Sequence, residues 1–153
     1  GAEAAPAISG GADHTWSTVV TYTGTDTTEP VLNYAHGSAS ANVTTLYCPG
    51  IKVVPAGCVV VAAFAWAADS AGPFVTTFAN ADLGSVTERT DAGTVSANGG
   101  GLAVGDGTFS GPGYAGAWSL TVTSSNGSLA TLVLQPPAAA SSSGPSMSRV
   151  VNA

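Results

Sequence analysis

Few side chains in this sequence are of the types that carry out acid–base or nucleophilic chemistry. It has two histidines, His14 and His36, and both lie in stretches rich in small and polar residues. A hydrolase needs a serine or cysteine positioned by a histidine, and the Gly-x-Ser-x-Gly turn that often presents such a serine is absent. We therefore expect both histidines to be exposed loop residues, and we expect no catalytic residue and no enzyme activity.

The carboxylates do not form a recognisable catalytic or metal-binding pattern. Glycoside hydrolysis needs two carboxylates that face one bond, whereas those of the central sequence are scattered through expected turns: Glu29, Asp69, Asp82, Glu88, Asp91 and Asp106. Glu88 and Asp91 flank Arg89, and this spacing predicts a surface ion pair or an Asx-type turn. No Asp-x-Asp-x-Asp series is found, so we expect neither a metal nor another cofactor.

The two cysteines lie close together in the segment CPGIKVVPAGC, at Cys48 and Cys58. Two neighbouring strand ends could bring the sulfurs into bonding range, and such a short-loop disulfide would contribute about 2–3 kcal/mol. The alternative is a pair of reduced, buried side chains that act as small hydrophobic residues. The spacing leaves both alternatives open, but it fits neither zinc ligation nor a Cys-x-x-Cys redox pair.

Aromatic side chains offer the best candidate for ligand binding, because a flat apolar ring with a polar tip suits a sugar. Trp66 lies in an apolar run and Trp118 begins an alternating one, so we expect both to be buried. Tyr114 stands in the Gly-rich segment GPGYAGA, and we expect it to be an exposed binding aromatic.

Composition excludes two classes of partner. Only 8% of the residues are charged, the net charge is −6 and the isoelectric point is about 4.3, so no basic surface is available for nucleic acid. The longest apolar run, Cys58 to Ala68, is far shorter than the roughly 20 residues of a membrane-spanning helix. We expect neither nucleic-acid binding nor membrane insertion.

The chain divides into three parts on composition. Residues 1–12 are small, apolar and punctuated by Gly and Pro, which predicts an N-terminal arm. Residues 13–136 carry the apolar periodicity of one domain, and Gln135-Pro136-Pro137 closes it because proline cannot continue a central strand. Residues 137–153 form a low-complexity C-terminal tail.

Short runs of β-branched and aromatic residues, separated by Gly, Ser, Asn and Pro, predict strands throughout the domain. The run at Val59–Trp66 is apolar at nearly every position, which indicates a central strand covered on both faces. Gly105-Asp106-Gly107 predicts a turn, and Ser125-Asn126-Gly127 predicts a hairpin between the last two strands. The other expected strands are 15–23, 31–34, 43–47, 51–54, 74–78, 85–89, 102–104, 118–123 and 129–134.

No helical window of good propensity is present, so the fold class is all-β. We expect an antiparallel two-sheet sandwich, jelly-roll-like or immunoglobulin-like, with an extended arm and tail.

From Thr23 to Pro136 the sequence resembles virion proteins of tailed bacteriophages, the β-sandwich modules of fibres, spikes and head or tail decorations. The similar pieces are TGTDTT, a Pro-Ala-Gly before an apolar strand, the TERTD segment, the run NGGGLAV and a last strand that ends near a proline.

The resemblance implies a non-enzymatic structural protein on the virion surface, which docks onto capsid or tail proteins through its terminal arms. It also implies self-association as a homo-oligomer and contact with the host surface, for example a glycan, and it supplies no catalytic residue. The alternative is a secreted carbohydrate-binding module or an adhesin fragment.

Overall fold

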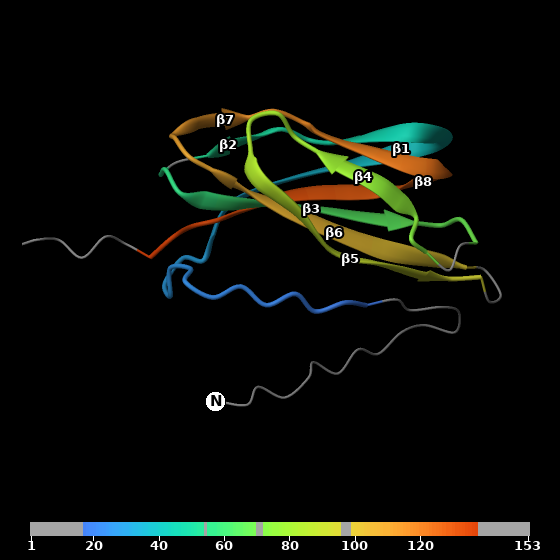
Figure 1. Cartoon of the computed structure of the whole chain (residues 1–153), viewed down its shortest axis with the longest axis horizontal. Helices are drawn as coiled ribbons and strands as arrows, with labels where there is room; N and C mark the ends of the chain where they lie inside the picture. The colour runs from blue at the N-terminus through green and yellow to red at the C-terminus, as the bar shows by residue number, and fades with distance from the viewer. Residues whose placement is uncertain (1–16, 54, 70–71, 96–98, 138–153) are drawn as a thin grey trace, which may run out of the picture.

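The computed structural model describes residues 17–53, 55–69, 72–95 and 99–137. Every regular element among them is a strand (Figure 1). The expected arm, 1–12, and all of the expected tail except Pro137 lie outside the described residues, as does Trp16. The strands are β1 Val31–Cys48, β2 Ile51–Val53, β3 Cys58–Trp66, β4 Val75–Ala79, β5 Gly84–Thr94, β6 Gly100–Phe109, β7 Gly113–Ala115 and β8 Trp118–Leu134.

The strands pair in a nested order. β1 pairs with β8, β2 with β7 and β3 with β6, all antiparallel, and β5 follows at the far side of β6. The main path is therefore β1-β8-β3-β6-β5, and β4 joins it through β8. The expected all-β antiparallel sandwich is confirmed, and nested pairing of this kind is the jelly-roll arrangement.

The long strands β1 and β8 pass through both layers of the sandwich. In the first part of β8, residues 119–122 pair with β4, whereas the second part, from Gly127 to Leu134, pairs with β3. In Figure 1 the layer that contains β4 lies over the layer formed by β3, β6 and β5. The hairpin predicted at 125–127 is wrong, because β8 continues through these residues while it crosses between layers.

Separately predicted runs therefore belong to single strands. The segments 118–123 and 129–134 are two parts of β8, and 31–34 and 43–47 are two parts of β1. Register shifts between Ala39 and Thr45 mark the place where β1 changes layer alongside β8.

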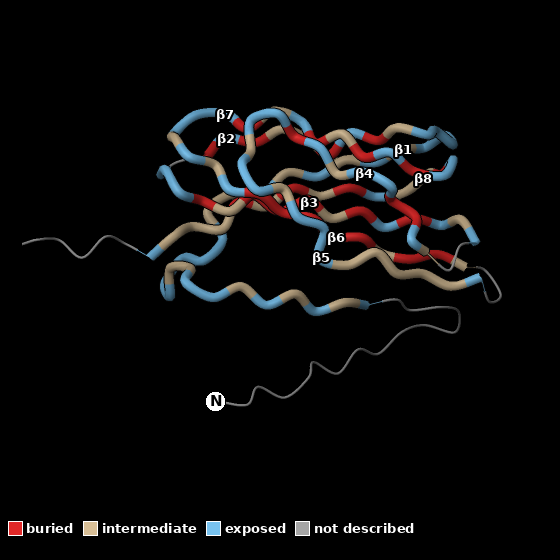
Figure 2. The backbone as a smooth tube through the Cα atoms, viewed as in Figure 1, coloured by how far each residue is buried: buried red, intermediate tan, exposed pale blue. Residues whose placement is uncertain are grey.

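The core lies between the two layers. Alternate side chains of β3 point inward, and Val60, Ala62 and Phe64 are completely buried, as expected for a central strand. The prediction that both faces of β3 are covered is wrong at Ala65, which is exposed on the outer face. Phe74 stacks on Trp66 at a ring distance of 4.5 Å. Figure 2 shows buried positions along β3, β6 and β8. Each large apolar side chain buried in this way contributes roughly 1.5–3 kcal/mol.

Glycines in β6 make room for the second layer. A Cβ on Gly105 would lie 2.7 Å from the Phe78 ring, and one on Gly107 would lie 3.0 Å from Leu83. The turn predicted at 105–107 is therefore wrong, since these glycines serve close packing inside a continuous strand. At the start of β6, Gly100 has a φ of +115°, and Gly101 leaves no room for a Cβ beside Trp66.

Candidate docking surface

Residues 17–30, here called the strap, lie across the surface of the domain. They form no strand, so the strand predicted over 15–23 is wrong for its described part. Burial nevertheless alternates: Thr18, Val20 and Tyr22 are half-buried, whereas Val19 is 68% exposed. The alternating pattern in the sequence thus comes from packing against the domain, without the hydrogen-bond ladder of a strand.

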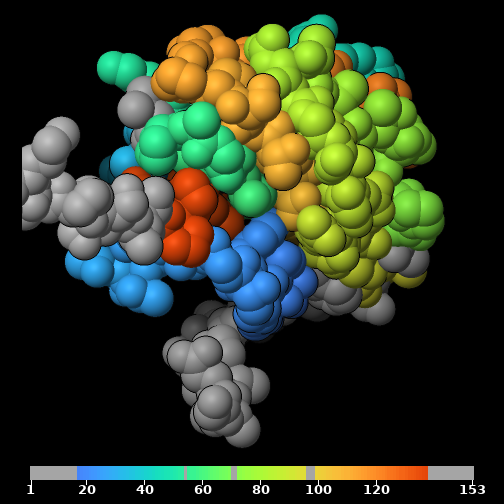
Figure 3. Space-filling model, turned by 60° about the vertical axis from the view of Figure 1, so that its left-hand side comes forward, coloured from blue at the N-terminus to red at the C-terminus, as the bar shows by residue number. Residues whose placement is uncertain are grey.

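The C-terminal part of the strap is tied to the end of β8. The Asp26 N–H donates to the Gln135 carbonyl at 2.9 Å, and the Gln135 N–H donates to the Pro30 carbonyl at 3.0 Å. Asp26 also caps the turn that follows it, because its Oδ1 accepts from the N–H of Thr28 and of Glu29. In Figure 3 the strap, in blue, lies directly against the domain beside the red end of β8.

The N-terminal part of the strap is anchored on Asp106 in β6. The Tyr22 hydroxyl donates to Asp106 Oδ2 at 2.8 Å. Arg89 binds the same carboxylate with two nitrogens, Nε on Oδ2 at 2.5 Å and Nη2 on Oδ1 at 2.9 Å. Asp106 is 3% exposed, and three donors compensate its buried charge, two of them from the Arg89 side chain, which is 45% exposed.

The anchor changes the acidity of both partners of Asp106. Burial, and then the hydrogen bond to Asp106, raise the pKa of Tyr22 above its usual value. The hydrogen bond to Asp106 also raises the pKa of Arg89. Both effects favour the protonated donors that the carboxylate requires.

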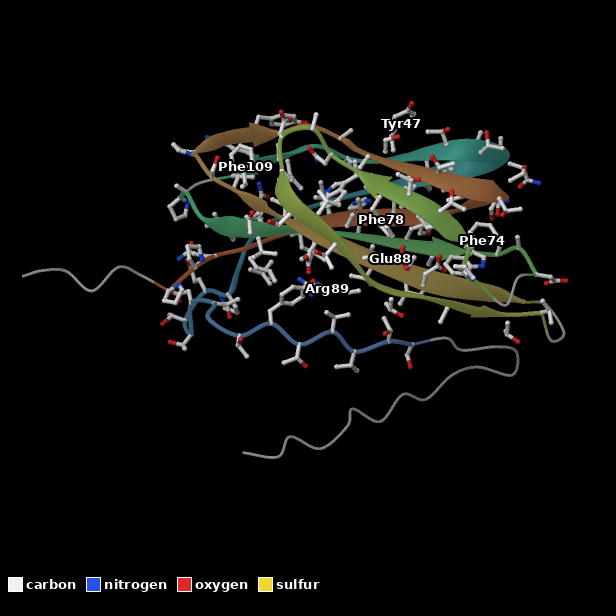
Figure 4. All side chains as sticks on the ribbon, viewed as in Figure 1. Tyr47, Phe74, Phe78, Glu88, Arg89 and Phe109 are labelled. Atoms are coloured by element: carbon white, nitrogen blue, oxygen red, sulfur yellow. The ribbon has the colours of Figure 1, made fainter. Side chains whose placement is uncertain are left out.

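A β-bulge aims Arg89 at this site. The register between β5 and β6 shifts between Glu88 and Thr90, so Arg89 lies in the bulge. Figure 4 shows its side chain on the side of the sheet that faces the strap. The prediction that Arg89 pairs with its neighbours is wrong, because among the described residues its ion pair is with Asp106.

The two acids that flank Arg89 lie in β5 and not in a turn. Asp91 Oδ2 accepts from the N–H groups of Phe74 and Val75, both at 2.6 Å, and thereby holds the start of β4. Burial, and then the nearby Asp91 carboxylate, raise the pKa of Glu88. These contacts are structural, since they hold one layer against the other.

Beside the strap, the outer face of the sheet carries a shallow groove of about 440 Å³. Ala63 lines this groove, in register with Ala130 of β8 and Val104 of β6. Small side chains account for the hollow. The lining residues are His36, Gly37, Ala63, Ala65, Leu102, Ser128, Leu129 and Ala130.

The remaining candidates for chemistry are separated. His36 is exposed but lies in β1 and not in the predicted loop, and His14 is outside the described residues. Glu29, Asp69 and Asp82 are exposed at different places on the surface. The described part of the chain holds no cluster of three or more groups able to ligate a metal, and no helix there could span a membrane.

Both cysteines are buried free thiols, which is the second of the two alternatives left open by the sequence. Cys48 Sγ lies 3.8 Å from the Ala63 carbonyl, and Cys58 Sγ lies 3.0 Å from the Pro55 carbonyl. Burial raises the pKa of Cys48 to about 12 and also raises the pKa of Cys58.

We expect both thiols to be unreactive in the folded protein and free after unfolding without reductant. A chromogenic disulfide reagent should react at least about tenfold more slowly with the native protein than with the denatured one, because burial disfavours the thiolate. The denatured chain should titrate as two thiols and a Cys58→Ser variant as one. A denatured, unreduced chain that yields no thiol would instead establish a disulfide.

The predicted burial of two tryptophans and the predicted exposure of Tyr114 are confirmed, and the binding role of Tyr114 stays a prediction. Trp66 and Trp118 are buried, at 4% and 0% exposed, and Tyr114 on β7 is 64% exposed. Sequence reasoning missed Tyr34 and Tyr47, which are 71% and 65% exposed. Both lie at exposed positions of β1, where exposed and more buried residues alternate in the structure. They belong to the two different layers, and Figure 4 shows Tyr47 on the side away from the strap.

These features define a class of protein: an all-β antiparallel sandwich with an N-terminal strap anchored outside its core. A scan against protein-family models, a search of curated proteins and a search of solved structures found no match.

Proposed function

We propose that this chain is a non-enzymatic structural module of a phage particle, a decoration or fibre protein displayed on the virion surface and attached through its terminal segments. The observation that carries the proposal is the strap, an extended segment outside the core whose position is defined by the buried Asp106 carboxylate. Because the strap is held against the domain, the position at which an N-terminal arm would begin is fixed.

Two further features support the same function. Jelly-roll sandwiches are a common architecture of capsid proteins, although they also occur in lectins and enzymes, so the fold favours the proposal without deciding it. An extended arm can add a strand to an exposed sheet edge of a neighbour, and main-chain hydrogen bonds then supply affinity without special side chains. The resemblance of residues 23–136 to virion modules points the same way.

The test is electron microscopy of virus particles from the native source, with the chain located by gold-labelled antibody. We expect label at repeated, symmetric positions on the particles. Residues 1–12 should be needed for attachment, so a variant without them should no longer sediment with particles that lack the chain. If the full chain is found only as a free protein, or if the shortened chain sediments as well as the full one, the proposal is wrong.

The exposed Tyr114 favours one alternative, a carbohydrate-binding module. Its neighbour across the β2–β7 ladder is Lys52, so an aromatic face and an ammonium group stand together on the small sheet. A glycan array with the full chain and a Tyr114→Ala variant tests this alternative. Binding of a glycan by the full chain that the variant loses would support it, and absence of any bound glycan would remove it.

A further inference from the structure

The strand β1 is an open edge of the main sheet. In the ladders of the described residues, β8 lies on one side of β1 and no strand lies on the other. One end of this edge is closed by Asn33, whose side chain accepts from the Tyr34 N–H and donates to the Lys52 carbonyl. Beyond Asn33, β1 keeps a regular register with β8 as far as Ala39, and the register then shifts between Ala39 and Val43, so the regular stretch available for pairing is 35–39.

This edge lacks the usual protection against pairing with another chain. Natural edge strands are commonly blocked by charged side chains or proline. The 18 residues of β1 contain no Asp, Glu, Lys, Arg or Pro, and β8 and β3 beside it also contain none. The net charge of −6 is thus carried by other parts of the molecule, and a second copy could approach β1 without like-charge repulsion.

Exposed apolar side chains are concentrated on the same strand. Of the seven large hydrophobic residues that are exposed among the described residues, four belong to β1. Val31 and Tyr34 lie next to the pairing stretch, whereas Val43 and Tyr47 lie beyond the register shift, in the other layer. The groove on the outer face reaches β1 at His36 and Gly37, so apolar surface continues from the edge across β8 to β3. An apolar, uncharged surface next to free backbone groups is typical of an interface.

We propose that the β1 edge pairs with the β1 edge of a second copy of this chain. The two strands run antiparallel about a twofold axis at Gly37, so that His36 of each copy lies opposite Ser38 of the other. The pairing joins the main sheets of the two copies into one sheet, and Tyr34 covers the junction. In a twofold contact the same surface of each copy meets its counterpart, so any charge near the axis would meet a like charge. The β1 surface has no charged side chain and avoids this repulsion.

This inference deepens the proposed function, because it names the surface for self-association of a displayed module and rests on that function for its biological purpose. Its test uses the isolated full chain and does not require a particle. A monomeric chain found on particles would therefore overturn the pairing alone, and a dimeric chain absent from particles would overturn only the proposed function.

The measurement is sedimentation velocity over a concentration series up to about 1 mM. We expect wild type to form a dimer. The double variant His36→Lys/Ser38→Lys should dimerise at least about tenfold more weakly, because the introduced lysines face each other across the axis. A matched control is Thr121→Lys/Thr123→Lys, at two exposed positions with the same spacing in β8. This control should dimerise like wild type.

Two further variants test whether residues 36 and 38 of the two copies meet, and whether residues 1–16 take part in the contact. Mixing the lysine variant with His36→Glu/Ser38→Glu should restore dimers, now of mixed composition, since opposite charges meet across the axis. Deleting residues 1–16 should leave dimerisation unchanged. A wild type that stays monomeric, a lysine variant that dimerises like wild type, a mixture without dimers, or loss of dimers on deletion of 1–16 would each overturn the proposal.

Discussion

Replacing Gly127 by alanine is expected to lower the free energy of unfolding by about 3 kcal/mol, because an alanine Cβ has no space where β8 crosses between the layers. It would lie 2.0 Å from the Ala65 carbonyl oxygen and 2.8 Å from the ring of Phe64. The nearest obstacle is backbone of the central strand β3, which cannot rotate away as a side chain can. The strands would have to separate locally, and the neighbouring core would lose contacts.

Thermal and denaturant unfolding measure this effect. For a chain of this size a loss of about 3 kcal/mol lowers Tm by roughly 6–12 °C. Gly111→Ala is the matched control, because a Cβ there meets nothing within 4 Å, and its Tm should change little. A Gly127→Ala variant as stable as the control would mean that β8 does not pass against β3 at this point.

Replacing Asp106 by asparagine is expected to cost about 2 kcal/mol and to release the N-terminal part of the strap. The carboxylate accepts three hydrogen bonds, from Tyr22 and from two nitrogens of Arg89. An amide of the same shape has one acceptor oxygen, and its NH₂ group would face the donors of Arg89. Asp106 itself is 3% exposed, whereas the Arg89 side chain is 45% exposed and can regain hydrogen bonds to water, which keeps the expected cost moderate.

Denaturant unfolding reports the stability, and amide hydrogen exchange of residues 17–23 reports the strap. Glu29→Gln is the control, since it removes the same charge at an exposed position of the strap. Tyr22→Phe removes only the hydroxyl, and its effect should be much smaller in the Asp106→Asn background than in wild type. Additive effects of the two substitutions, with unchanged exchange in the strap, would show that Asp106 does not anchor it.

The Asp106→Asn substitution also tests the proposed attachment of the protein to a particle. If the strap is released while the sandwich stays folded, the arm loses its fixed origin, and attachment to a particle should weaken as it does on removal of the arm. The anchor and the proposed pairing edge lie on opposite sides of the groove, on β6 and β1. Substitutions at Asp106 and at His36 can therefore separate attachment from self-association.

The sequence by itself determined the all-β class, the central position of β3, the burial of Trp66 and Trp118 and the exposure of Tyr114. These features depend on local patterns, since alternation or continuity of apolar residues decides which side chains must leave water. The end of the last strand at Leu134 follows from the prolines after it in the same way.

Two kinds of feature depend on the tertiary structure: whether segments of turn-like composition form turns or strands, and which charged side chains pair. Gly105, Asp106 and Gly127 have turn-forming composition, yet all three lie within strands. Gly105 leaves room for Phe78 of the second layer, Gly127 leaves room for the neighbouring strand β3, and Asp106 supplies the acceptor for the strap. Arg89 finds its partner across the β5–β6 ladder, and β1 becomes an edge only because β8 lies between it and β3. These contacts join residues that are distant in the sequence, so local sequence patterns cannot predict them.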